Sequence, residues 1–318
     1  MLCWCPSKIT ITNMHDGTRL AAVDLGSNSF RLEIGRVEGG KFCRSDYFKE
    51  TVRLGNGLDE RSQLTPQAMQ RGWDCLGRFG ERLRAFAPDL VSAVTTQTLR
   101  EARNRDAFLT QANTLLGHTI QVISGEQEAR LIYQGVAQAL PDTAERRLVI
   151  DIGGRSTELI VGTGCQTRRM ASFPVGSVGW SMLYFADGAL TPDAFTRAEQ
   201  AATEVLAPAL AFCAPDLWDV AYGSAGTVNA VVDVLTGAGW PPGHVSQEGL
   251  NWLLEKLVAA HNAGQLSMMG LRDDRKAIIG GGLSILRALF TLLGITRLEQ
   301  SLGGLRHGLL VDLMHNPA

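Results

Sequence analysis

The chain has 318 residues, of which 45% are hydrophobic and 19% charged, a composition typical of a folded globular protein. A single core rarely grows to this length, so we expect two domains. The formal net charge is -2, from 30 basic and 32 acidic residues, and it lacks the basic excess of proteins that coat nucleic acid.

The N-terminal segment has neither a basic start nor a long apolar stretch, so we expect no secretory signal. The Cys3-Trp4-Cys5 pair is more typical of a frayed terminus than of a metal site. Six scattered cysteines without zinc-ligand spacing predict reduced thiols in a cytoplasmic protein: Cys3, Cys5, Cys43, Cys75, Cys165 and Cys213.

Hydrophobic periodicity and turn residues predict a mixed α/β chain. A Thr-Pro pair marks the start of the helix expected over Thr65 to Phe86. The other expected elements are strands at Leu90 to Thr95 and Thr119 to Ile123, a helix at about Glu126 to Leu140, helices around Pro192 to Phe212, a strand at Val220 to Tyr222, a glycine-rich turn at Gly223 to Thr227, and helices at Leu250 to His261 and Ser284 to Leu293.

Two segments of this chain resemble each other, Leu20 to Val37 and Arg147 to Gly162. Each has a short apolar run, an aspartate, a turn of glycine and small hydroxyl residues, and a second apolar run. This pattern predicts a β-hairpin with Asp24 or Asp151 at the end of its first strand. The repeat indicates two similar domains that each begin with this hairpin, and the absence of a low-complexity linker suggests that they pack around a cleft.

The segment from Ala277 to Ile295 is the one candidate for a membrane span, because Arg287 is its only charge. Three successive glycines and the arginine favour a strand, a turn and a helix inside a core instead. We therefore expect no membrane association.

The two hairpin turns, Asp24 to Ser29 and Asp151 to Thr157, have the residues of an anion site. Glycine lets backbone N–H groups converge on an anion, hydroxyls add donors, and the aspartates can hold a divalent cation. One such turn alone would be explained by ordinary turn chemistry. Two matching turns favour binding of a phosphate chain.

The segment ISGEQEARLI, Ile123 to Ile132, contains a capping box formed by Ser124 and Gln127 at a helix start. Glu126 and Glu128 then lie in the first turn, where the helix dipole favours acids. This explains both glutamates without any chemistry, and periodicity does not distinguish them because both flank the apolar stripe.

Two further residues also have structural explanations. Glu158 follows the second turn and fits an outward-facing strand residue as well as a functional acid. Arg100 can bind phosphate in a bidentate manner, but it can equally belong to a solvated helix face with Arg103 and Arg105.

In chain order, VDLGSNSFRLEI, TLREA, ISGEQEARLI, IDIGGRSTELIVG, GSAGT and the segment near IIGGGLSIL resemble the Ppx/GppA family of exopolyphosphatases and guanosine-pentaphosphate phosphatases. The match runs from about Leu20 to Leu310. The resemblance implies an α/β protein of two RNase H-like domains, from the actin, sugar-kinase and chaperone superfamily, with mixed sheets that face a central cleft. Domain I would span residues 1–131, with a C-terminal helix at about 304–314 returning to it, and domain II residues 132–303.

The resemblance also implies roles for individual residues. Glu128 corresponds to the proposed catalytic base, and Glu158 to a second catalytic acid. Arg100 would contact phosphate, with Thr98 as a weaker candidate, and the GSAGT turn resembles one that contacts adenosine elsewhere in the superfamily. The phosphate-binding residues would be Gly26, Ser27, Asn28, Ser29, Arg100, Gly153, Gly154, Ser156 and Thr157, and a divalent cation, Mg²⁺, would be held by Asp24, Asp151 and Glu158.

The sequence departs from the family in two respects. Arg155 stands where the family often has a third glycine, so we expect an ordinary φ there and consider a phosphate contact by its side chain as a hypothesis. Larger members carry an additional helical region of the HD type, whereas this chain stops at Ala318 and resembles a short form. A homodimer is compatible with the sequence.

The implied activity is metal-assisted hydrolysis of the terminal phosphoanhydride bond of polyphosphate or of pppGpp, with direct attack by water. An ATP-dependent kinase of the same superfamily is one alternative. A regulatory module that binds polyphosphate or (p)ppGpp without turnover is the other, although a sensor has no need for Glu128 as a base.

Overall fold

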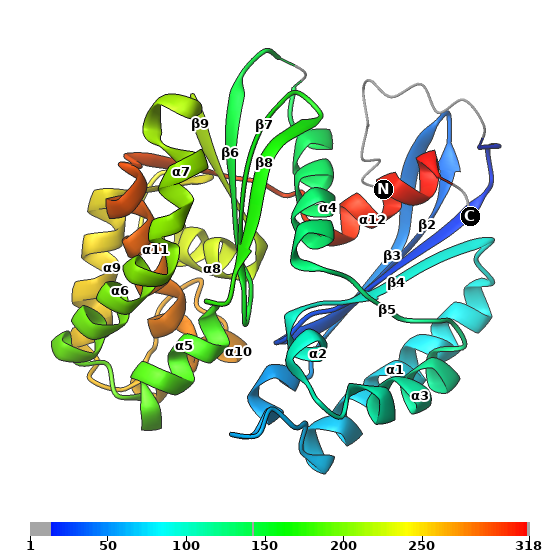
Figure 1. Ribbon diagram of the computed structural model, residues 1–318, viewed down its shortest axis with the longest axis horizontal. Helices are drawn as coiled ribbons and strands as arrows, with labels where there is room; N and C mark the ends of the chain where they lie inside the picture. The colour runs from blue at the N-terminus through cyan, green and yellow to red at the C-terminus, as the bar shows by residue number, and fades with distance from the viewer. Residues whose placement is uncertain (1–13, 142, 317–318) are drawn as a thin grey trace. The chain divides into compact units, whose positions relative to one another are not determined.

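The computed structural model describes residues 14–141 and 143–316, so the Cys3 to Cys5 pair lies outside the described residues. The chain divides into two compact units (Figure 1): unit 1 comprises Met1–Asp142 and Gly303–Ala318, and unit 2 comprises Thr143–Leu302. This division differs from the expected boundary after residue 131, which would cut through helix α4 (Gly125–Gln138). Helix α4 stays whole because it packs along its length in unit 1.

Within the described residues, unit 1 has a sheet of five strands in the order β3-β2-β1-β4-β5. Strand β2 is antiparallel to β1 and β3, whereas β1, β4 and β5 are parallel, which is the mixed sheet of an RNase H-like domain. The elements are β1 (Arg19–Leu25), β2 (Ser29–Glu38), β3 (Lys41–Thr51), the 3-10 turn η1 (Leu54–Gly57), α1 (Pro66–Phe86), β4 (Leu90–Thr95), α2 (Gln97–Glu101), α3 (Arg105–Leu116), β5 (Gln121–Val122), α4 and α12 (Leu305–His315).

The side chains of β1 alternate between two cores, as the period of a strand requires. Ala21, Val23 and Leu25 pack on the face covered by α1 and α3. Leu20 and Ala22 pack on the other face, where α4 and α12 lie (Figure 1). Asp24 is the next residue of β1 on the same face as Leu20 and Ala22, so its carboxylate lies on the side of the sheet where α4 packs.

Helix α12 brings the end of the chain back to unit 1 through contacts between glycines. A Cβ added to Gly308 would lie 1.9 Å from the carbonyl oxygen of Leu131, and one on Gly135 would lie 2.2 Å from that of Gly304. Only residues without a side chain allow this approach of the α4 and α12 backbones. The contact fixes α4, which carries Glu128 in its first turn.

Unit 2 repeats the arrangement: its sheet order is β10-β11-β9-β6-β7-β8, and β8-β7-β6-β9-β11 corresponds to β3-β2-β1-β4-β5. The internal repeat predicted from the two hairpins is thereby confirmed. The elements are β6 (Arg146–Ile152), β7 (Thr157–Thr163), β8 (Gln166–Phe173), α5 (Ser177–Tyr184), η2 (Ala186–Gly188), α6 (Pro192–Leu206), η3 (Ala207–Ala209), α7 (Leu210–Cys213), η4 (Pro215–Leu217), β9 (Val220–Ser224), α8 (Ala225–Gly237), β10 (His244–Ser246), α9 (Gln247–Ala259), η5 (Ala263–Gln265), α10 (Asp273–Lys276), α11 (Ile279–Leu293) and β11 (Arg297–Gln300).

Local signals fix several helix starts as predicted. The hydroxyl of Thr65 accepts a hydrogen bond from the backbone N–H of Ala68 at the start of α1. The helices expected around Pro192 to Phe212 are present as α6 and α7, which are separated by η3. Pro208 lies at the break, where it has no N–H to continue the helical hydrogen bonds.

The strand and turn expected within Ala277 to Ile295 are wrong, because α11 already begins at Ile279 and includes all three glycines. Packing overrides their low helix propensity. A Cβ on Gly281 would lie 2.6 Å from the backbone nitrogen of Ser181 in α5, and one on Gly282 would lie 2.7 Å from Thr227 in α8. None of the helices in the described residues combines the length and apolar character needed to cross a bilayer.

The α4–α12 contact gives a testable expectation for stability. We expect Gly308→Ala to lower the free energy of unfolding by about 1–3 kcal/mol, because its methyl group overlaps the Leu131 carbonyl. Gly77→Ala in α1 is the matched control: nothing lies within 4 Å of its added Cβ, so it should stabilise by about 0.5–1 kcal/mol. Urea unfolding curves measure both changes, and equal effects would contradict the close contact.

Candidate active site

The first hairpin turn, Gly26 to Asn28, is held in place by two other segments of unit 1. Thr98 of α2 donates a hydrogen bond from its hydroxyl to that of Ser27 at 2.7 Å. The carbonyl of Ser27 accepts from the N–H of Gly55, and that of Asn28 accepts from the N–H of Arg53, both at 2.8 Å. The turn is therefore a fixed element. Thr98, the weaker candidate for a phosphate contact, is buried and supports the turn, and its contact with phosphate stays a prediction.

Asp24, near the end of β1, faces Arg31 across the hairpin. Its carboxylate is 4% exposed and receives a hydrogen bond from Nη1 of Arg31 at 2.8 Å. A guanidinium thus already neutralises Asp24.

Glu128 lies in the first turn of α4, where the predicted capping box is present. The N–H of Gln127 donates to the hydroxyl of Ser124 at 3.1 Å, and the N–H of Ser124 donates to the Gln127 side chain at 2.8 Å. Glu126 is exposed, whereas Glu128 is only 6% exposed. Burial separates the two glutamates that periodicity could not distinguish.

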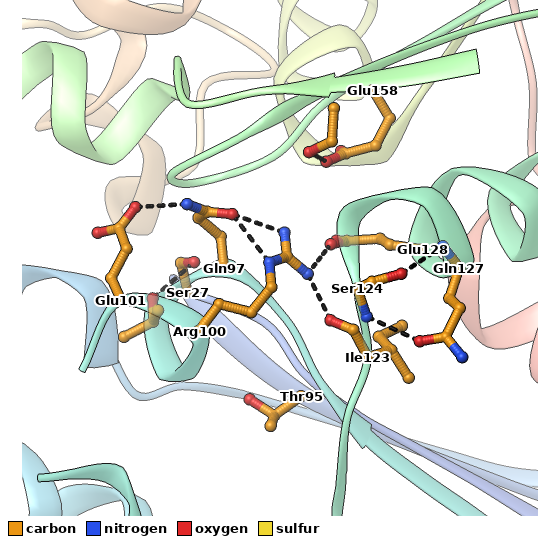
Figure 2. A network of polar contacts seen from close by, with 12 residues as sticks. Ser27, Thr95, Gln97, Arg100, Glu101, Ile123, Ser124, Gln127, Glu128 and Glu158 are labelled. Atoms are coloured by element: carbon orange, nitrogen blue, oxygen red, sulfur yellow. Dashed lines mark hydrogen bonds and ion pairs between the residues drawn. The ribbon is translucent and has the colours of Figure 1, made fainter. Parts of the chain in front are cut away.

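Arg100 of α2 connects to Glu128 (Figure 2). Its Nη1 lies 2.8 Å from Oε2 of Glu128 and also donates to the carbonyl of Ile123 at 2.8 Å. Nε and Nη2 donate to Oε1 of Gln97 at 3.0 and 2.6 Å. The residues expected as phosphate ligand and base thus form an ion pair in unit 1, whereas Arg103 is exposed as a solvated residue would be.

The second turn, Gly153 to Ser156, is clamped by the start of α5. The N–H groups of Ser177 and Val178 donate to the carbonyls of Gly153 and Gly154 at 2.9 and 2.7 Å. A Cβ on Gly176 would lie 2.4 Å from the backbone nitrogen of Arg155, so glycine is required for this approach. The sequence analysis missed this clamp, because Gly176 stands in no recognised motif.

The backbone angles in the two turns are ordinary. Gly26, Gly153 and Gly154 all have ordinary φ, so no left-handed residue builds either turn. Arg155 also has an ordinary φ, as predicted, and is therefore unstrained in place of glycine. The Thr157 hydroxyl donates to the carbonyl of Val175 at 2.6 Å, and Thr157 itself is buried in β7 between β6 and β8.

Asp151 and Glu158 lie directly opposite each other in the antiparallel β6–β7 pair. Their carboxylates share the face opposite to the helix-packed residues Ile150 and Leu159, and are 6% and 1% exposed. Ser172 of β8 donates to Oε1 of Glu158 at 2.7 Å. A row of oxygen-bearing side chains thus crosses the sheet in the order Ser224, Asp151, Glu158 and Ser172, of which the first three are buried and Ser172 is half-buried.

The turn Gly223 to Thr227 brings in a residue that the sequence analysis did not select. A Cβ on Gly226 would lie 2.1 Å from Nη2 of Arg275, which is buried. Ala225, with φ of 63°, has a strained left-handed conformation at this point. Arg275 belongs to the charged run LRDDRK, which has no local sign of a buried cation.

The oxygen donors in unit 2 fit a divalent cation of the magnesium type. No three His, Cys, Asp or Glu side chains gather into a metal site in the part of the chain that the structure describes. Mg²⁺ is, however, often held by one or two carboxylates together with water and substrate phosphate, which the Asp151–Glu158 pair could supply. The expectation that Asp24 also contributes stays a prediction.

The bond between Ser172 and Glu158 can be tested on stability. We expect Ser172→Ala to lower the free energy of unfolding by about 1–3 kcal/mol, because a buried carboxylate loses a donor. In a Glu158→Gln background the same substitution should cost clearly less. Urea unfolding of the four proteins measures this coupling, and an equal cost in both backgrounds would contradict it.

Comparisons with known proteins identify the family of the chain. The model of the Ppx/GppA phosphatase family matches residues 36–317. An exopolyphosphatase from Cytophaga hutchinsonii is 24% identical, with a TM-score of 0.83 over 93% of this chain and 97% of that one. The PPX-GPPA enzyme of Aquifex aeolicus is 25% identical, with a TM-score of 0.75 over 93% and 99% of the two chains. With its two mixed sheets, its repeated hairpin and a family match over most of its length, the chain belongs to the Ppx/GppA phosphatase family.

Proposed function

We propose that this chain hydrolyses the terminal phosphoanhydride bond of inorganic polyphosphate and releases orthophosphate. Family membership and the similarity to an exopolyphosphatase and a PPX-GPPA enzyme support this activity. The observation that carries the proposal is the buried carboxylate of Glu128, held by Arg100 at the start of α4. A buried, oriented carboxylate of this kind suits a general base.

In the proposed reaction, Glu128 takes a proton from the attacking water, and the leaving phosphate departs from the terminal phosphorus in line with the attack. In unit 1, Arg100 and the turn from Gly26 to Ser29 are the phosphate-binding groups that we propose. In unit 2, they are the residues of the turn from Gly153 to Thr157. Since Arg100 already donates to Glu128 through Nη1, we propose an N–H of Nη2 as its donor to phosphate.

Mg²⁺, held by Asp151 and Glu158, would supply positive charge that offsets the charge on the phosphates. The two carboxylates themselves keep their positions through the β6–β7 register, and Ser172 orients Glu158. The requirement for the cation and the identity of the metal are part of the proposal.

Direct attack by water is favoured over a covalent intermediate. Burial raises the pKa of the Cys213 thiol to about 12, and burial also raises that of Cys75. Burial, with Arg306 and Arg44 nearby, lowers the pKa of His307 to about 3, so this buried imidazole stays neutral. These three groups do not provide a thiolate nucleophile or a protonated histidine at neutral pH.

A second substrate, pppGpp, has a terminal phosphoanhydride bond of the same type, and the family includes enzymes named for both. The kinase alternative predicts phosphate transfer only when an acceptor is present. The binding-module alternative predicts phosphate binding without release. One assay separates these possibilities.

We expect Glu128→Gln to lower kcat for phosphate release by about 10²–10⁴-fold, because the amide cannot accept the proton from water. Phosphate release from long-chain polyphosphate and from pppGpp measures the effect, with no acceptor present. Glu126→Gln, an exposed acid on the same turn, is the matched control and should retain wild-type activity. Full activity of a folded Glu128→Gln protein would exclude Glu128 as the base, and no release by wild type would favour the binding module.

We also expect EDTA to abolish phosphate release and Mg²⁺ to restore it. Asp151→Asn should raise the Mg²⁺ concentration for half-maximal activity by about 10-fold or more, because one proposed ligand is weakened. Asp193→Asn, 78% exposed on α6, should leave it unchanged.

Asp24→Asn decides the role of the third aspartate. A Mg²⁺ requirement equal to that of wild type would restrict Asp24 to pairing with Arg31, whereas a shift like that of Asp151→Asn would add it to the cation site. Metal-independent release by wild type would contradict the cation proposal as a whole.

A further inference from the structure

Gln97, the first residue of α2, holds the side chain of Arg100 on the edge that faces away from Glu128 (Figure 2). Its Oε1 accepts hydrogen bonds from Nε at 3.0 Å and from Nη2 at 2.6 Å. We infer that Gln97 is a positioning residue that fixes the Arg100 guanidinium for catalysis. The inference rests on the proposed phosphate hydrolysis, and neither the family motif nor the sequence analysis selects Gln97.

The orientation of the Gln97 amide is itself determined by a third residue. Nε2 of Gln97 donates to Oε1 of Glu101 at 2.6 Å, one helical turn further along α2. An ionised carboxylate only accepts hydrogen bonds, so the NH₂ group of Gln97 must face Glu101 and its oxygen must face Arg100. The chain of donors and acceptors from Glu101 to Glu128 therefore runs in one direction.

This chain determines where Arg100 can bind phosphate. A guanidinium has five N–H groups. Four of them have acceptors among the described residues: two point to Gln97, one to Ile123 and one to Glu128. One Nη2 N–H remains for a phosphate oxygen, and its direction is set by the plane that Gln97 fixes. Without Gln97, the long side chain would keep only its Nη1 contacts and could rotate about them.

Helix α2, which carries both Gln97 and Arg100, is itself fixed to the first turn. Thr98, next to Gln97, binds the hydroxyl of Ser27 in the first turn, so the helix and the turn are fixed together. Gln97 is half-buried and Arg100 is 18% exposed, which limits competition from water. By contrast, the Gln70–Asp74 pair on α1 has the same spacing and a similar distance of 2.7 Å, but it is exposed and contacts no arginine.

A double-mutant cycle on kcat/KM for phosphate release from polyphosphate tests the inference. We expect Gln97→Leu to lower kcat/KM by about 10- to 100-fold, because the guanidinium is misplaced. In an Arg100→Lys background, which retains a positive charge, Gln97→Leu should change it by less than about 2-fold. Gln70→Leu is the matched control and should have no effect. An undiminished loss in the Arg100→Lys background would overturn the inference, because Gln97 would then act independently of Arg100.

Exchanging the two partners of Gln97 provides a rescue experiment. The double variant Gln97→Glu with Glu101→Gln exchanges the two side chains, so composition and net charge are unchanged. The carboxylate at position 97 accepts from Arg100, and the amide at position 101 donates to that carboxylate. We expect activity to return to within about 3-fold of wild type, since the acceptor for Arg100 is restored. Activity as low as that of Gln97→Leu would contradict the inference.

A measurement without turnover separates this inference from the proposed function. The Nε–H resonance of Arg100, identified by its loss in Arg100→Lys, should exchange with water at least about 10-fold faster in Gln97→Leu than in wild type. Unchanged exchange overturns the positioning by Gln97 even if wild type is active. If wild type releases no phosphate, the proposed function fails, and the catalytic consequence of Gln97 fails with it whatever the exchange rates.

Discussion

The register of the first hairpin in each unit determines the electrostatics of the whole candidate site. Strand β1 pairs Asp24 with Arg31, and strand β6 pairs Asp151 with Glu158. A slip of one residue would turn every side chain to the other face and bury the charges among apolar residues. Parallel pairing with β4 and β9 on the other edge of these strands fixes the same register from a second side. The positions of the acids thus follow from the core packing.

The same fold therefore supplies two different environments. In unit 1, the buried acids Asp24 and Glu128 are each matched by an arginine. In unit 2, two buried carboxylates face each other in a row that ends in hydroxyls. Burying like charges is costly unless positive charge compensates for them. The residue opposite each aspartate thus differs between the two units: an arginine faces Asp24, and a glutamate faces Asp151.

Local chemistry made part of this arrangement predictable. The Thr65 cap, the Ser124–Gln127 capping box and both hairpins depend on neighbours in sequence. The glycines of α11 were assigned wrongly, because their helix depends on the close approach of Ser181 about a hundred residues away. The Arg100–Glu128 ion pair and the burial of Arg275 could not be predicted either, because hydrophobic periodicity and motif spacing do not indicate which side chains distant in sequence are in contact. The role proposed for Glu128 comes from the family motif, and its burial is the structural observation that supports the proposal.

Arg100 then has two tasks, which its geometry assigns to different atoms. Its Nη1 donates to Glu128 and to the carbonyl of Ile123, while Nε and one N–H of Nη2 donate to Gln97. The N–H that remains on Nη2 is the donor that the proposed reaction gives to phosphate. Under the proposed function, one guanidinium plane would therefore hold the base and the phosphate in a fixed relation to each other.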